Sequence, residues 1–162
     1  MKLERCIPAG KNRHFACPRC GEPGNPVPEV TLKALLRGSA LERRKRSEHR
    51  FCSTANCPVV YFGTDESFTG DDLNVPVFQK EPPGNRTVCY CFEVKESEVR
   101  REMSEDGLSP VFAKITRLVN ADLCACELKN PQGNCCLGNM GRIVRSRVET
   151  LPDTFQKGTR LP

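Results

Sequence analysis

NADLCACELKNPQGNCCLGN, residues 120–139, is a loop-forming stretch that carries four cysteines within twenty positions. The cysteines are Cys124, Cys126, Cys135 and Cys136. Pro131, Gly133 and Gly138 interrupt regular secondary structure in the same stretch. Adjacent cysteines rarely serve one small site together, so we expect only part of this set to bind any one metal centre.

The composition predicts a small protein that depends on metal sites. The chain has 162 residues, with 11 cysteines, no tryptophan, 6% aromatic and 38% hydrophobic residues. This length allows one or two small lobes. Because the apolar inventory is thin, we expect metal sites or disulfides to supply part of the stability.

The cysteines are expected to be metal ligands or redox thiols of a cytoplasmic protein. No apolar run approaches the length of a membrane span, and residues 1–15, MKLERCIPAGKNRHF, contain no signal-peptide core. Persistent disulfides are rare in a reducing compartment. The odd number of cysteines, 11, leaves at least one outside any paired scheme, and Cys6 stands apart from the rest.

The net charge of +5 comes partly from the run RRKR at 43–46. Such a run could contact nucleic acid or an acidic partner. We favour the simpler interpretation, in which it is the solvated C-terminal end of a helix, where cations suit the helix dipole.

The breaker QKEPPGNRT, residues 79–87, predicts a boundary between two lobes. We therefore expect an N-terminal arm over 1–14, a zinc-binding lobe over 15–80, a second metal-binding lobe over 81–150 and a C-terminal tail over 151–162.

Local patterns predict a few helices and strands on each side of that boundary. In the first lobe they indicate a helix over about 31–46, a strand over 58–63 and a weaker strand over 73–80. In the second they indicate an extended segment over 87–94 and helices over 95–107, over 109–123 with Ser109 as N-cap, and from Leu137 onward.

Four cysteines of the first lobe predict a structural zinc site. CPRC at 17–20 and CSTANC at 52–57 are separated by 31 residues, which suits tetrahedral zinc bound by two tight loops. A redox dithiol is disfavoured because prolines, rather than a helix, follow the first pair. Of the two histidines, His49 is a better substitute ligand than His14, although an exposed histidine is the commoner outcome.

CYC at 89–91 predicts a different kind of metal site. On extended chain its two thiols point the same way, which suits ligands to iron better than a zinc knuckle does. Cys124 follows Cys91 after 32 residues and Cys126 follows it after 34. A 2Fe-2S cluster needs four thiolates, so the loop must supply two of them. The other two loop cysteines would then not be cluster ligands.

The order CxC, two short helices, cysteine, loop, cysteine, helix resembles the 2Fe-2S domain of bacterioferritin-associated ferredoxins. Together, CPRCG, FCSTANCPVVYFG, VCYCFEV and CACELKNPQGNCCLG resemble the N-terminal region of CopZ-type copper chaperones over roughly residues 15–148. The resemblance implies an α+β fold, with a zinc-ribbon or knuckle-like lobe followed by a mainly helical 2Fe-2S lobe.

The resemblance also implies ligand sets. Zinc would be held by Cys17, Cys20, Cys52 and Cys57. The cluster would be held by Cys89, Cys91, Cys124 and Cys136, with Cys126 and Cys135 as the second choice in the loop. In the ferredoxin family the fourth ligand opens the last helix, which matches Cys136 before Leu137, and the family's spacing matches Cys124 best.

The function implied is electron transfer linked to copper handling, including reduction of Cu(II) to Cu(I). Expected partners are a redox protein and a copper-exporting pump or separate copper domain, because no MxCxxC copper motif occurs in the chain. The two spare loop thiols would bind Cu(I) transiently or simply shape the loop. The alternative is a zinc-stapled interaction or nucleic-acid-binding module; a cysteine-nucleophile enzyme is disfavoured because no histidine follows His49.

Overall fold

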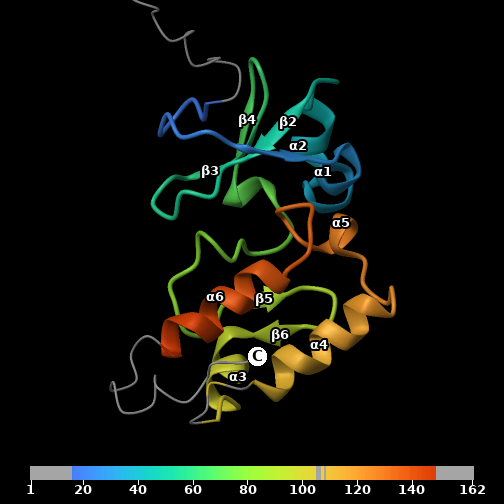
Figure 1. Ribbon diagram of the computed structural model, residues 1–162. Helices are drawn as coiled ribbons and strands as arrows, with labels where there is room; N and C mark the ends of the chain where they lie inside the picture. Colours follow the sequence, from blue (N-terminus) through green and yellow to red (C-terminus); the bar gives the residue numbers. More distant parts are fainter. Residues whose placement is uncertain (1–15, 105–106, 108, 149–162) are drawn as a thin grey trace, which may run out of the picture.

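The computed structural model describes residues 16–104, 107 and 109–148. The expected N-terminal arm with Cys6 and His14, and the expected tail over 151–162, lie outside the described residues. Figure 1 shows a small sheet with two short helices at one end of the molecule and a mainly helical region at the other. We call them the sheet half, residues 16–73, and the helical half, residues 87–148, and we call residues 74–86 between them the connector.

The sheet half is built on four antiparallel strands in the order β1-β2-β3-β4. They are β1 (Asn25–Val27), β2 (His49–Phe51), β3 (Val59–Phe62) and β4 (Ser67–Thr69). Every residue of β3 is buried, so both faces of this strand are covered. The strand predicted over 58–63 is confirmed by β3.

Two short helices replace the single helix predicted over 31–46. α1 (Glu29–Leu35) and α2 (Gly38–Arg43) are separated by extended backbone at Leu36 and Arg37. Leu36 forms a β-bridge with Leu73, and the Arg37 N–H donates to the Asp72 carbonyl at 2.8 Å. This long-range pairing outweighs the local helical pattern, so the prediction was wrong at the break.

The predicted strand over 73–80 is also wrong. Beyond the single bridge at Leu73 the connector turns, and the Lys80 N–H donates to the Val77 carbonyl at 2.8 Å. Val77 packs into the core of the sheet half, whereas Phe78 packs into the core of the helical half. The connector is therefore held by both halves.

The helical half begins with a hairpin, β5 (Thr87–Cys89) and β6 (Val94–Lys95), so the segment predicted as extended over 87–94 turns back on itself. Four helices follow: α3 (Glu96–Arg101), α4 (Pro110–Asn120), α5 (Cys126–Lys129) and α6 (Leu137–Val148). The predicted N-cap of α4 is confirmed, since the Ser109 side chain accepts from the Phe112 N–H at 3.2 Å. The short helix α5 was not expected.

The basic run at 43–46 is largely engaged within the sheet half. Arg43 pairs with Asp72 at 2.7 Å and lies over the Phe68 ring, while Arg44 pairs with Glu29 at 2.9 Å. Within the part of the chain described, no helix is both long and apolar enough to cross a membrane.

Candidate metal centres

The structure brings the four cysteines of the first predicted site together. Their Sγ atoms all lie within 4.8 Å of one another, with 3.8 Å from Cys17 to Cys57 and 3.7 Å from Cys20 to Cys52. Four sulfurs at the corners of a tetrahedron around zinc, each about 2.3 Å from the metal, would be roughly 3.8 Å apart. The observed separations fit that geometry.

Local structure explains how each pair reaches this point. Cys17 and Cys20 flank a tight turn that ends at Gly21, whose φ of +76° favours glycine. Cys52 follows β2 directly, and Cys57 leads into β3. The site is therefore formed by the two ends of the β2–β3 connection together with the separate turn that carries Cys17 and Cys20.

The thiols of this group have opposed ionisation tendencies. Burial is the largest effect on Cys17 and raises its pKa to about 12. The Thr54 hydroxyl, followed by the backbone around Glu22, lowers the pKa of Cys20 to about 6. Neighbouring thiolates repel each other at such short range, so full ionisation of all four requires a cation.

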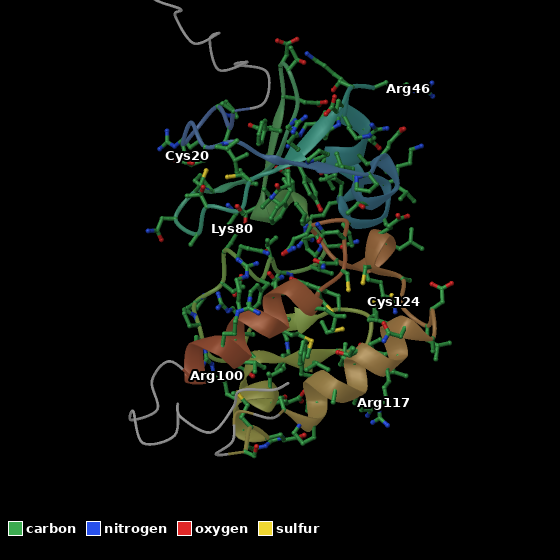
Figure 2. The ribbon with its side chains drawn as sticks, in the orientation of Figure 1. Cys20, Arg46, Lys80, Arg100, Arg117 and Cys124 are labelled. Carbon is green, nitrogen blue, oxygen red and sulfur yellow. The ribbon has the colours of Figure 1, made fainter. Side chains whose placement is uncertain are left out.

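Lys80 lies against the same site (Figure 2). Its Nζ is 3.7 Å from Cys52 Sγ and donates to the Thr54 carbonyl at 2.6 Å. Lys80 comes from the connector, 28 residues after Cys52, and no local spacing in the sequence indicates this contact.

His49 is a structural residue of the sheet half. It is 3% exposed, its Nε2 lies 2.8 Å from Glu66 Oε1, and its Nδ1 lies 2.8 Å from the Ser47 carbonyl. Both ring nitrogens are thus engaged without a metal. The expectation of an exposed, solvated histidine was wrong because this pair ties β2 to the turn before β4.

A second constellation of thiols lies in the helical half. Cys91 Sγ is 3.7 Å from Cys126 Sγ. Cys89 and Cys136 form the other pair, in which each thiol shifts the pKa of its neighbour. The backbone of Cys136 partly offsets the raised pKa of Cys126, and this effect connects the two pairs. Cys89 closes β5, Cys126 opens α5, and Cys136 directly precedes α6.

These four thiols lie at the edge of the apolar core of the helical half. Cys89 and Cys136 are each 1% exposed and pack with Val88, Val99 and Met140, whereas Cys91 is half-buried. The hydrogen bond with Cys136 is the main cause that lowers the pKa of Cys89 to about 6, and it raises the pKa of Cys136. Burial is the main cause that raises the pKa of Cys126.

The other two loop cysteines lie differently. Cys126 is the thiol beside Cys91, while Cys124, the first choice from spacing, is half-buried two residues before it, and Cys135 is exposed. Cys126 is the first residue of the short helix α5, whereas Cys124 precedes that helix. Sequence spacing alone could not indicate α5, because it lies between a loop and a proline.

Comparisons with known proteins bear on the first of the two constellations. Residues 14–74 match a family model for the CopZ-type zinc binding domain. Together with the four-cysteine group, the match supports zinc as the metal bound in this part of the chain.

Relatives of known name extend the similarity into the helical half. The copper chaperone CopZ of Archaeoglobus fulgidus is 29% identical over 127 residues, which is 78% of this chain. The match spans 60% of that relative's length. The X-ray structure of the Archaeoglobus fulgidus CopZ N-terminal domain superimposes with a TM-score of 0.65 at 28% identity, covering 79% of this chain and 96% of that one.

Proposed function

We propose that this protein holds two metal centres and works as an electron carrier in copper handling. Zinc would be bound by Cys17, Cys20, Cys52 and Cys57 in a structural role. A 2Fe-2S cluster would be bound by Cys89, Cys91, Cys126 and Cys136. The observation that carries the second assignment is the approach of Cys91 Sγ to Cys126 Sγ at 3.7 Å, with Cys89 and Cys136 buried in the same apolar cluster.

The donor set fits such a cluster. Thiolates are the common ligands of 2Fe-2S clusters, with two on each iron, and the helical half offers two adjacent pairs of thiols. The Ala125 N–H points at Cys91 Sγ at 3.3 Å, and hydrogen bonds of this kind tune the reduction potential. When bound, the cluster would accept and donate one electron at a time. One electron is also what converts Cu(II) to Cu(I).

Exposure indicates where an electron would leave. Cys89 and Cys136 are each 1% exposed and Cys126 is 8% exposed, while Cys91 is half-buried. A redox partner would therefore approach from the side of Cys91. Reduction of a metal ion would be an enzyme-like activity of this centre.

The link to copper rests on the relatives. The Archaeoglobus fulgidus relative is a copper chaperone by name, so we assign this chain a role in handling the same metal and a copper transporter or copper-binding domain as partner. We place the protein in a reducing, cytoplasmic compartment, since the ten cysteines of the described residues are free thiols. We also infer that residues 81–150 form a cluster domain like that of bacterioferritin-associated ferredoxins, separate from the zinc lobe over 15–80.

Metal analysis of anaerobically purified protein tests the proposal. We expect a brown protein with about two iron, two sulfide and one zinc per chain, bleached by dithionite. A colourless protein that binds about two zinc, even after reconstitution with iron and sulfide, would instead support the zinc-stapled interaction module.

Alanine variants of two neighbouring cysteines test the ligand set. Cys126→Ala should lose most of the cluster iron, because it removes the thiol beside Cys91. Cys124→Ala is the matched control and should retain iron, sulfide and the visible spectrum. The reverse result would restore the ligand set expected from spacing.

A further inference from the structure

The loop between two proposed cluster ligands, Cys126 and Cys136, rests on the sheet half. Thr31 Oγ1 donates to the Glu127 carbonyl at 2.7 Å, and the Tyr61 hydroxyl donates to the Pro131 carbonyl at 2.8 Å. Both donor side chains belong to residues that are 0% exposed. Figure 1 shows α5 lying beside α1, where the first of these contacts is made.

Close backbone packing adds a third contact. Gly133 has a φ of +67°, and a Cβ placed there would lie 2.4 Å from Pro28 Cδ and 2.9 Å from Thr31 Oγ1. The loop backbone is therefore seated directly on the segment that opens α1. Glu127, Pro131 and Gly133 are thus fixed by the sheet half at points spread along the whole span between the two cysteines.

Tyr61 lies close to two of the proposed zinc ligands. Tyr61 pairs across the sheet with Phe51, the residue before Cys52, and it follows Cys57 by four positions. Tyr61 lies on β3 and is paired with β2, and the connection between these two strands begins at Cys52 and includes Cys57. Loss of zinc would release the end of the sheet that holds this hydroxyl in place.

The connector makes a parallel link between the two centres. Lys80 contacts Cys52 at one end, and the Phe78 N–H donates at 2.9 Å to the hydroxyl of Tyr90, which lies between Cys89 and Cys91. Gln79, between them, hydrogen-bonds the side chain of Gln132 in the cysteine loop.

We propose that Tyr61 and Thr31 are positioning residues for the cluster and that the filled zinc site holds Tyr61 in register. This inference rests on the proposed function, since it presumes a cluster at Cys89, Cys91, Cys126 and Cys136. Zinc would then have a task beyond stabilising its own domain: it would set the separation of Cys126 and Cys136. Cluster lifetime would depend on zinc occupancy.

The test compares Tyr61→Phe and Thr31→Val with the wild-type protein, each loaded with zinc and cluster. We expect cluster loss to an iron chelator to be roughly five- to tenfold faster in each variant, because a carbonyl of the cysteine loop loses its donor from the sheet half. The visible circular dichroism spectrum and the reduction potential should shift, with zinc content unchanged. Zinc removal should speed cluster loss strongly in the wild type. The effect should be smaller in Tyr61→Phe, because that variant already lacks the hydrogen bond from Tyr61 to the Pro131 carbonyl.

Phe68→Leu is the matched control. Phe68 is also 0% exposed and lies in the same apolar core, on β4, opposite Tyr61. This change weakens the packing and the Arg43 contact but leaves the Tyr61 hydroxyl in place. It should leave the cluster spectrum and potential unchanged.

Two results would overturn the inference: wild-type kinetics in Tyr61→Phe, or an equal spectral change in Phe68→Leu. Wild-type protein without iron would overturn the proposed function as well, so the two failures are distinguishable.

Discussion

Lys80 contacts the zinc site although no sequence motif indicates it. Its ammonium lies 3.7 Å from Cys52 Sγ and is anchored by the Thr54 carbonyl. Four thiolates around one zinc dication leave a net negative charge, and a nearby ammonium offsets part of it. The residue therefore favours the ionised, metal-binding form of the site.

Lys80→Ala should release zinc faster. Since Lys80 is only half-buried, we expect its contact to contribute about 1 kcal/mol, or roughly a fivefold change in zinc affinity. Competition with a chromogenic zinc chelator measures it. Lys80→Arg should retain most of the affinity. Lys45→Ala, which removes an exposed lysine 4.0 Å from Asp65, should have no effect, and an equal loss there would point to net charge instead of the contact.

At the scale of elements, a buried carboxylate joins α3 to the connector. Glu96 opens α3 and its side chain is 0% exposed. Its two oxygens accept from Arg86 at 2.6 Å and Arg100 at 2.7 Å, and Arg86 also lies over the Phe78 ring. Burial alone would raise the pKa of Glu96, but the hydrogen bonds from Arg100, Gly84 and Arg86 outweigh it and lower the pKa.

Glu96→Gln should lower the free energy of unfolding by about 3 kcal/mol at neutral pH, because two arginines lose their shared anion. The folded-state pKa is depressed, so the carboxylate's contribution is complete above the usual value of 4.5 and is lost as the pH falls through the folded value. The difference between wild type and variant should therefore shrink below about pH 4.5 in denaturant titrations. Glu102→Gln, on an exposed carboxylate, serves as control. A difference that stays constant with pH would contradict the ion-pair argument.

At the scale of the whole molecule, the two halves meet through a glycine. Gly133→Ala must adopt a φ of +67° and places a methyl group 2.4 Å from Pro28 Cδ. We expect a loss of at least about 2 kcal/mol, from the left-handed conformation and the clash together. Thermal unfolding of the zinc-loaded protein measures it.

Gly138→Ala is the natural comparison for this change. Gly138 lies in α6, and a Cβ there meets nothing within 4 Å. Alanine should be neutral or stabilise the helix by about 0.5–1 kcal/mol. Equal destabilisation by the two variants would show that the close packing of Gly133 against Pro28 does not contribute to stability.

Features encoded by neighbouring residues could be predicted from the sequence. The zinc cysteines follow from two tight pairs, α4 from Ser109 and a helical apolar period, and β3 from a run of β-branched and aromatic residues. Each depends on geometry that repeats within a few residues along the chain.

Only the tertiary structure decided which distant groups meet. The break between α1 and α2 depends on a bridge from Leu36 to Leu73, and the seating of the cysteine loop depends on Thr31 reaching Glu127 across 96 residues. The placing of Cys126 beside Cys91 belongs to the same class, since it depends on α5 packing against α1. Bringing residues together across such long stretches of chain has an entropic cost that packing of the whole molecule must offset. Hydrophobic periodicity and cysteine spacing within a short segment do not encode that packing.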